Sequence, residues 1–321
     1  ALQFGSWAPV CGGWLRTRDA NKKPSPGELV RLARHVERLG YDFYYVPEHY
    51  LNAIHGPRED VLDAWVVSSA AVAGTRRLRV ITAVQPGFKA PGVVAKMGAT
   101  LASFRPGAFG LSLLAGWWRL EVENYGDIWL PHAERYARAA EYLDVIRRFW
   151  TEPAFEHHGQ YFTIDGGVLE PKPDPLPPVI IAGESERAID LAARAGDYLF
   201  INGGDLEHVT SLVRKAKGRA AELHGRALKI VLSAFGIVRN TASEARAVVE
   251  SLRERADARM IAYFRQHMDG AVVAHNRGQE TDMLEANLGL STGLIGDPET
   301  ILEHVERLER AGVDAIMVKC E

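Results

Sequence analysis

Short apolar runs alternate with longer amphipathic stretches along nearly the whole chain, which predicts strands that are each followed by helical sequence. Apolar residues fill successive positions of the short runs, as is typical of parallel strands that are buried on both faces. The runs that we interpret as strands are residues 2–8, 42–46, 78–84, 109–115, 179–182, 198–201, 229–238 and 315–318.

Eight strands joined through helices have two usual arrangements, a closed (β/α)8 barrel and a doubly wound open sheet. A dinucleotide-binding open sheet carries Gly-x-Gly-x-x-Gly after its first strand, whereas here Cys11-Gly12-Gly13-Trp14 leads into a polar loop. Eight is also the strand number of the barrel. We therefore predict an α/β chain that folds as a single (β/α)8 TIM barrel domain over residues 1–321.

Helix starts are marked by capping residues. The sequences 25–28 (Ser-Pro-Gly-Glu) and 241–244 (Thr-Ala-Ser-Glu) predict capping boxes, and Asp297-Pro298 predicts another capped start. From His132 onward, apolar residues recur at helical spacing as far as Trp150, which predicts a helix that packs on the sheet.

Two segments are longer than a connector between barrel elements. Residues 151–178 alternate in polarity, turn at Gly166-Gly167 and end in a proline-rich stretch, which predicts a hairpin followed by a strap. Residues 256–296 contain glycines among polar and small residues, and so long an excursion predicts either a mobile lid or a disordered segment. We expect the helix that normally closes such a barrel to follow Glu321.

Composition narrows the class of protein. The 38 Lys and Arg nearly balance the 41 Asp and Glu, so there is no electrostatic attraction to nucleic acid or to an anionic membrane. The two cysteines, Cys11 and Cys320, lie at opposite ends of the chain without the spacing of a disulfide framework or a zinc site. No apolar run approaches the roughly 18 residues of a membrane span. We expect a soluble, cytoplasmic protein.

Side chains suited to a ligand gather after the carboxyl ends of the predicted strands, where the site of such a barrel lies. After the fourth strand come Trp117, Trp118 and Glu121, followed by Arg135 and Tyr136, a set that suits a planar, hydrogen-bonding ligand. Residues 183–185 (Gly-Glu-Ser) open a helix whose free N–H groups suit a phosphate, although the serine is equally an ordinary N-cap.

These side chains also have structural interpretations, which stay open at this point. Glu121 is either a partner for the edge of a heterocycle or an exposed loop acid, and Tyr136 is either a ligand contact or a core tyrosine. Arg135 is often a surface ion-pair residue in such a position. His49 is a candidate acid, base or substrate contact, although most loop histidines are none of these.

The sequence offers few reactive side chains of its own. It has no His-x-His on a predicted strand for a metal, no Gly-x-Ser-x-Gly elbow and no mid-strand lysine for a Schiff base. Glu48 and Glu121 form the only plausible glycosidase pair, which is a weak signal. We therefore expect no metal, and we expect a cofactor to carry the chemistry.

The motifs resemble those of the bacterial luciferase-like flavin monooxygenases. Within that family the chain is most similar to the two-component, FMNH2-dependent branch, which contains dimethylsulfone, alkanesulfonate and pyrimidine monooxygenases. The matching segments keep the family order over essentially the whole chain, at residues 7–9, 12–13, 85–88, 91–96, 116–121, 129–136, 183–185 and 296–298.

The resemblance implies a barrel that binds FMN as FMNH2, supplied by a separate NAD(P)H:flavin reductase, and oxidises a small sulfone or sulfonate with O2 and C–S cleavage. It implies flavin contacts at Pro47, Glu48, Ser112, Glu121, Arg135, Tyr136, Gly183, Glu184 and Ser185. It implies a substrate pocket of Trp7, Trp14, Phe88, Trp117, Phe235 and Arg277, with His49 as proton donor or substrate contact. By the same analogy the assembly is a homodimer or homotetramer.

Two departures from the family pattern bear on the substrate. Relatives carry asparagine on the fourth strand where this chain has Ser112, which reaches less far toward a flavin. Alkanesulfonate enzymes carry an arginine and a histidine where this chain has Ser233 and Phe235, which favours a less anionic substrate, although Arg277 or Arg16 is available for a sulfonate. Three alternatives stay open: an F420-dependent oxidoreductase of the same fold, a monooxygenase of an N-heterocycle, and a non-catalytic flavin-binding paralogue.

Overall fold

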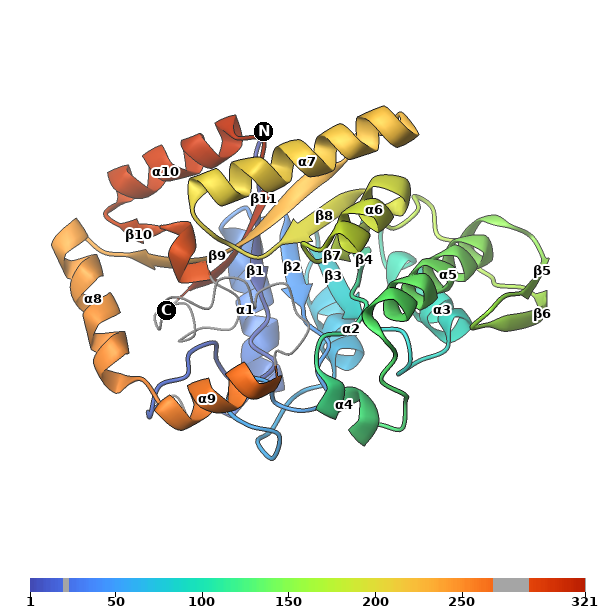
Figure 1. Ribbon diagram of the computed structural model, residues 1–321, viewed down its shortest axis with the longest axis horizontal. Helices are drawn as coiled ribbons and strands as arrows, with labels where there is room; N and C mark the ends of the chain where they lie inside the picture. The colour runs from blue at the N-terminus through green and yellow to red at the C-terminus, as the bar shows by residue number, and fades with distance from the viewer. Residues whose placement is uncertain (20–22, 268–288, 321) are drawn as a thin grey trace.

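A closed barrel of parallel strands forms the centre of the protein (Figure 1). The computed structural model describes residues 1–19, 23–267 and 289–320. In this part of the chain the barrel strands pair in the order β1-β2-β3-β4-β7-β8-β9-β11, and β11 pairs back with β1. They are β1 Gln3–Trp7, β2 Phe43–Val46, β3 Arg79–Val84, β4 Phe109–Leu113, β7 Val179–Ala182, β8 Tyr198–Ile201, β9 Lys229–Val238 and β11 Ala315–Cys320. The predicted (β/α)8 barrel is confirmed, with each strand at its expected position.

Helices alternate with the strands and cover the outside of the barrel (Figure 1). They are α1 Pro26–Arg38, α2 Ala64–Gly74, α3 Pro91–Ala102, α4 Arg119–Asn124, α5 His132–Thr151, α6 Glu186–Ala195, α7 Leu206–His224, α8 Ala242–Arg255, α9 Ala258–His267 and α10 Pro298–Arg310. The predicted capping box of α8 is present, and Asp297 accepts the backbone N–H of Thr300 at 2.9 Å at the start of α10. The predicted box of α1 is absent: Ser25 is the N-cap residue, but its side chain makes no capping hydrogen bond. Pro26 fixes its φ angle near the helical value, and this favours the start of α1 without a capping box.

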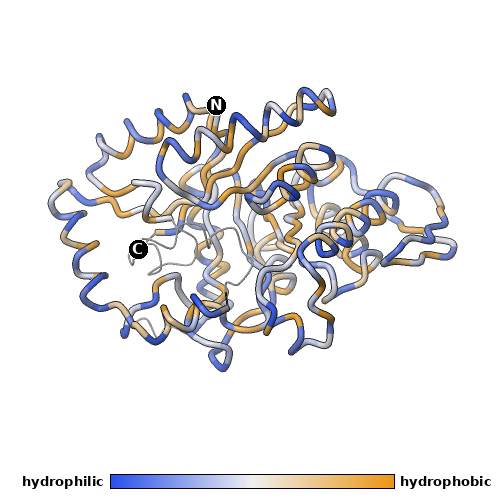
Figure 2. Tube along the Cα trace, viewed as in Figure 1, coloured by the Kyte–Doolittle hydropathy of each residue, from blue (hydrophilic) through white to orange (hydrophobic). Residues whose placement is uncertain are grey.

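Two apolar layers hold the barrel together. The inner layer consists of inward-facing strand residues, among them Trp7, Phe43, Tyr45, Ile81, Ile180, Phe200 and Met317. The outer layer lies between strands and helices, and Figure 2 shows hydrophobic residues along the strands and stripes of them on the surrounding helices. A Cβ on Gly5 would lie 2.1 Å from the sulfur of Met317, so the interior is filled at this level and a ligand must bind nearer the mouth.

The stretch between β4 and α5, predicted to be a loop, contains the short helix α4. Its six residues begin without a side-chain cap, which is why the sequence does not mark it. The helix buries Glu121 and Val122. An acid that the sequence places in a loop is therefore held by helical backbone beneath the barrel mouth.

Two excursions depart from the barrel plan. Between α5 and β7, strands β5 Phe155–His158 and β6 Thr163–Gly167 form an antiparallel hairpin that projects from one end of the molecule (Figure 1, green). Between β9 and α10 lie α8, α9, the 3-10 turn η3 Gly289–Thr292 and the short strand β10 Ile295–Gly296. The predicted lid, residues 256–296, includes residues 268–288, which lie outside the described residues, and its mobility stays a prediction. No helix in the described segments is both long and apolar enough to cross a membrane.

Candidate functional site

A cavity opens at the carboxyl ends of the barrel strands, where the sequence predicts the site. The predicted residues in its wall are Trp7, Trp14, Pro47, Glu48, His49, Trp117, Arg135, Tyr136, Gly183, Glu184 and Ser185. Further wall residues are Cys11, Arg16, Tyr45, Ala53, Ile54, Ala83, Leu114, Ala115, Gly116, His132, Ala182, Phe200, Asn202 and Phe264. Strand ends from around the barrel thus contribute to one cavity.

One end of the cavity lies at the start of α6. Ser185 is the N-cap residue, and its hydroxyl oxygen accepts the backbone N–H of Ala188 at 3.2 Å. Gly183 has a φ of +133°, and a Cβ there would lie 2.9 Å from the hydroxyl of Tyr136. Glycine therefore allows the tyrosine to approach the helix start closely. Hydroxyl groups and free N–H groups meet here, an arrangement that suits an anion.

Arg135 adds positive charge to this end. Its guanidinium stacks on Trp129, with 3.9 Å between Cζ and the ring centroid, and its Nη1 donates to the Leu130 carbonyl at 2.9 Å. Its Nε is buried and has no hydrogen-bond partner among the described residues. Burial, assisted by nearby Arg138, lowers the pKa of Arg135. A bound anion would offset this unfavourable burial of charge.

The two acids that flank the α6 cap residue both have basic partners. Glu184 lies 3.5 Å from the ring of His208, and this contact raises the pKa of His208. Glu186 lies 3.0 Å from Arg219 and is also hydrogen-bonded to Lys215. These basic partners on α7 weaken the repulsion between the two carboxylates and an anion at this helix start.

Aromatic side chains form the floor of the cavity. Trp7 and Tyr45 have ring centroids 4.5 Å apart, and Tyr45 stacks on Phe200 at 5.5 Å. Trp14 meets Trp7 edge-on at 5.6 Å. These residues offer flat apolar surfaces to a planar ring system.

The far wall joins the loop after β1 to α9. Arg16 is fully buried, donates from Nη2 to the Ala53 carbonyl at 3.0 Å, and lies with its Cζ 3.6 Å from the ring centroid of Phe264. Trp117 meets the same phenylalanine edge-on at 6.0 Å. A cation and two aromatic rings are thus brought together from three distant parts of the sequence.

The loop after β2 brings an acid and a histidine into the wall. The carboxylate of Glu48 accepts the backbone N–H of Gln85 at 2.7 Å and pairs with Lys89 at 3.0 Å. Burial raises the pKa of Glu48, and Lys89 counteracts this effect. The Nδ1 of His49 lies 3.5 Å from the carboxylate of Glu121. One buried carboxylate, that of Glu48, therefore stands in this wall, and a second, that of Glu121, lies behind it.

Ser112 and Glu121, both predicted as flavin contacts, lie behind the wall rather than in it. The hydroxyl of Ser112 is 3.1 Å from that of Tyr45, which does line the cavity. Glu121 is fully buried and accepts the backbone N–H groups of Tyr50 at 2.8 Å and Leu51 at 3.2 Å. Direct contact of either side chain with a flavin stays a prediction.

Two predicted substrate-pocket residues lie outside the cavity wall, and a third is not among the described residues. Phe88 packs against Tyr50, with ring centroids 4.4 Å apart, outside the cavity wall. Phe235 is buried in an apolar cluster with Phe264, behind the far wall. Arg277 lies outside the described residues.

Some wall residues escape a sequence-based search. Tyr45 and Phe200 occupy inward positions near the ends of predicted strands, so alternation along β2 and β8 is a signal that identifies them. Cys11 carries no such signal. Burial raises the pKa of its thiol to about 12, so it contributes a neutral surface.

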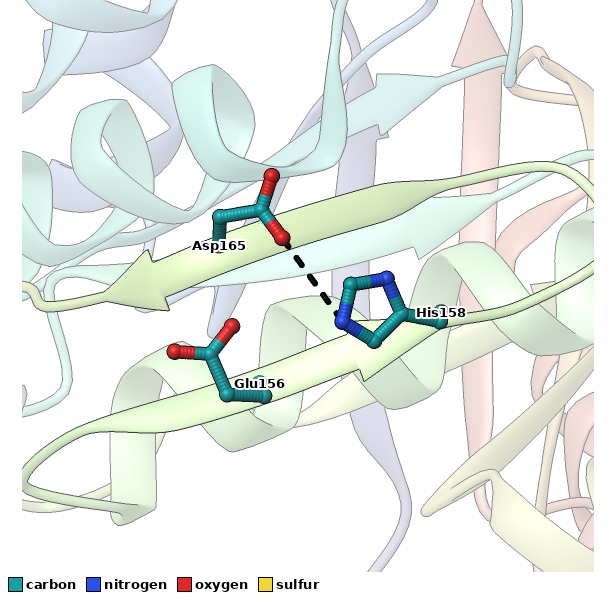
Figure 3. A group of neighbouring side chains, drawn as sticks. All are labelled: Glu156, His158 and Asp165. Carbon is teal, nitrogen blue, oxygen red and sulfur yellow. Dashed lines mark ion pairs between the residues drawn. The ribbon is translucent and has the colours of Figure 1, made fainter.

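A second group of ligand-type side chains lies on the β5–β6 hairpin (Figure 3). Glu156, His158 and Asp165 are exposed, and their ligand atoms lie within 4.8 Å of one another. The ring of His158 pairs with Asp165 at 3.6 Å, while Glu156 accepts the backbone N–H of Gly166 at 2.8 Å. We interpret them as cross-strand contacts of the hairpin.

Comparisons with known proteins agree with this geometry. The family described as luciferase-like monooxygenase matches residues 2–315. The FMNH(2)-dependent dimethylsulfone monooxygenase of Pseudomonas putida is 32% identical over 327 residues, covering 98% of this chain and 89% of that protein. The crystal structure of the long-chain alkane monooxygenase LadA has a TM-score of 0.84 at 19% identity, covering 99% of this chain and 86% of its own.

A structure with different chemistry also shares the fold. An F420-dependent secondary alcohol dehydrogenase in complex with an F420–acetone adduct has a TM-score of 0.78 at 21% identity, covering 99% of this chain and 93% of its own. At such identities the structural matches show the fold alone. The sequence matches go further and confirm the resemblance found in the motifs: the chain belongs to the luciferase-like monooxygenase family.

Proposed function

We propose that this chain is a two-component monooxygenase that uses FMNH2 and O2 to oxidise a small sulfone or sulfonate and cleave its C–S bond. A separate NAD(P)H:flavin reductase supplies the FMNH2. The identity of 32% to the dimethylsulfone monooxygenase of Pseudomonas putida supports the choice of coenzyme and substrate class. The observation that carries the proposal is the division of the cavity into a cationic end at a helix start and an aromatic remainder.

The cationic end fits the phosphate of FMN. Arg135 offers a buried Nε without a partner in the described part of the chain, and Tyr136 and Ser185 offer hydroxyl groups beside the start of α6. A phosphate accepts hydrogen bonds from such donors and is stabilised by the helix dipole. Gly183 keeps the approach open, because a side chain there would meet Tyr136.

The aromatic remainder fits the flavin ring. Trp7, Tyr45 and Phe200 provide apolar surfaces, and Pro47 and Glu48 stand in the wall of the same cavity. When bound, reduced FMN supplies the electrons that activate O2. The side chains of this protein bind and orient the coenzyme and exclude water from the reaction.

Ser112 and Glu121 act through their neighbours in this proposal. Ser112 orients the hydroxyl of Tyr45. Glu121 holds the backbone of the loop after β2 and lies next to the ring of His49. It thereby positions His49, our candidate for a proton donor or substrate contact.

Arg16 bears on the choice between a sulfone and a sulfonate. Its buried guanidinium lies in the cavity wall, and sulfonyl oxygens of either substrate are acceptors that it can bind. Ser233 and Phe235 add no cation on β9. We therefore expect a neutral sulfone to be the better substrate.

Within the predicted lid, α9 acts as a cover in this proposal, because it places Phe264 in the cavity wall. Phe264→Ala should admit water and raise the fraction of consumed O2 that appears as H2O2. An unchanged ratio of product to H2O2 would reject the cover.

Product analysis tests the proposed function. The protein is incubated in air with FMN, NADH, an independent flavin reductase and catalase, and with dimethylsulfone, methanesulfonate or uracil in separate reactions. We expect dimethylsulfone to give methanesulfinate and formaldehyde by mass spectrometry, and only when the reductase is present. If uracil were oxidised and dimethylsulfone were not, the substrate would be an N-heterocycle and not an organosulfur compound.

Two further outcomes separate the remaining alternatives. Binding of FMNH2 without any product would indicate a non-catalytic flavin-binding protein. Anaerobic titration with reduced FMN and reduced F420 distinguishes the coenzymes. Tight binding of F420 alone would overturn the proposal in favour of hydride transfer.

A further inference from the structure

Three side chains form a connected group between the cavity and the outside of the barrel. Glu48 lines the cavity and its side chain is 1% exposed, whereas that of Lys89 is 18% exposed. The ammonium of Lys89 donates to Glu48 Oε1 at 3.0 Å and to the hydroxyl of Tyr50, which itself donates to Glu48 Oε1 at 3.3 Å. Exchangeable hydrogens therefore extend without a break from solvent to the cavity wall.

We propose that Glu48 donates a proton to the reaction in the cavity, and that Lys89 and Tyr50 supply Glu48 with protons from solvent. The inference rests on the proposed function, because it assigns a role within that reaction. Lys89 and Tyr50 act through Glu48 and have no place in the cavity wall.

The proposed reaction needs such a donor. Insertion of one atom of O2 into the substrate takes two electrons from the anionic form of reduced FMN and releases the second oxygen atom as water. One hydrogen of that water comes with the reduced coenzyme, and the other is a proton taken from the protein. Glu48 in its acid form gives this proton, Lys89 then returns one to the carboxylate, and the lysine amine takes one from water.

The surroundings of Glu48 suit a change of protonation. Burial favours its neutral form, the neighbouring carboxylate of Glu121 acts in the same direction, and Lys89 favours the ionised form. The phenols of Tyr45 and Tyr142 are close enough to interact with Glu48, but burial raises the pKa of each, so both stay neutral. Lys89 is the only cation among the causes that act on Glu48 in the described part of the chain.

The link between Lys89 and Glu48 can be measured without flavin. Carboxyl groups of 13C-labelled glutamate are followed by NMR against pH, and the Glu48 resonance is assigned by its loss in Glu48→Gln. We expect a midpoint above the ordinary value of about 4.3, a still higher one in Lys89→Met, and one close to wild type in Lys89→Arg. The control Lys217→Met, which removes a lysine paired with Asp314 at 2.8 Å on α7, should leave it unchanged.

The proposal would be overturned if Glu48 titrated at the ordinary value of about 4.3. It would also be overturned if Lys89→Met left the midpoint of Glu48 unchanged. If Lys89→Met does not fold, the wild-type titration alone still shows whether the midpoint of Glu48 is raised. Lys89→Gln then serves as the variant that shows whether the midpoint depends on Lys89.

Turnover separates a proton route from a purely structural role. Lys89→Met should lose roughly 10²-fold in product formation at pH 8 and recover as the pH falls, because Glu48 then takes its proton directly from water. Its affinity for reduced FMN should equal that of wild type. An equal loss of rate at every pH, or a loss of affinity, would overturn the route and leave Lys89 a structural residue.

Failure of the proposed function is distinguishable from these results. If the wild type binds no reduced FMN or forms no product, the proposed function fails. The NMR titration then still decides whether Lys89 controls the protonation of Glu48.

Discussion

Removing the charge of Arg135 tests the phosphate end of the cavity directly. Arg135→Met keeps an alkyl stem of similar length but loses the guanidinium and its 2.9 Å hydrogen bond to the Leu130 carbonyl. A hydrogen bond from a charged, buried donor to phosphate contributes about 1.5–3 kcal/mol. Because 1.4 kcal/mol is tenfold in affinity, the Kd for reduced FMN should rise roughly 10- to 150-fold.

The assay compares reduced FMN with reduced riboflavin, which has the same ring system but no phosphate. Anaerobic titration followed by protein fluorescence gives a Kd for each. Arg135→Met should weaken FMN and leave riboflavin unchanged. Arg148→Met is the matched control, because it removes a guanidinium from the same helix, where Arg148 pairs with Glu152 at 2.8 Å, and it should change neither Kd.

Two results would refute the reasoning. An unchanged Kd for FMN would mean that the phosphate binds elsewhere. An equal loss for FMN and riboflavin would mean that Arg135 maintains the shape of the wall and does not contact the phosphate. Thermal unfolding checks the second case, since loss of the bond to Leu130 should cost only about 1 kcal/mol.

Three further predictions concern other parts of the fold. Gly183→Ala should lower the free energy of unfolding in urea by roughly 1–3 kcal/mol, and by more than Gly126→Ala, which has a φ of +87° but no neighbour within 4 Å. Burial raises the pKa of Glu37 and three backbone N–H donors lower it, with the donors prevailing. The ionised Glu37 carboxylate therefore stabilises the folded protein fully above its pKa in the unfolded chain, about 4.3. This stabilisation is lost as the pH falls through the lower pKa that Glu37 has in the folded protein. Glu37→Gln should destabilise at neutral pH, and this difference should shrink in acid. Glu121→Ala should weaken binding of reduced FMN by releasing the loop that carries His49, and an unaltered Kd would remove Glu121 from the site.

The barrel can be predicted from the sequence because its strands are buried on both faces. The run 109–115 is apolar at nearly every position, and it forms β4 at the expected place. The helix from His132 is equally visible, since its apolar stripe faces the sheet. Site residues just after strands, such as Glu48 after β2 and Gly183 after β7, follow from the barrel geometry once the strands are known.

Contacts behind the cavity wall cannot be predicted in the same way. The sequence does not show that Glu121 points into the protein, because α4 is short and begins without a capping residue. Nor does it show that Arg16 meets Phe264, since that contact joins the loop after β1 to a helix near the other end of the chain. Periodicity reports which face of an element is apolar, but not which distant element covers it.

Different elements of the barrel provide the proposed phosphate contacts and the proposed proton route. The elements after β4 and β7 provide Arg135, Tyr136 and Ser185, whereas the loops after β2 and β3 provide Glu48 and Lys89. Among the described residues, no hydrogen bond or ion pair joins Arg135 to Glu48 or Lys89. Binding of the phosphate and transfer of the proton therefore depend on separate contacts. For this reason we expect Arg135→Met to change affinity and Lys89→Met to change turnover.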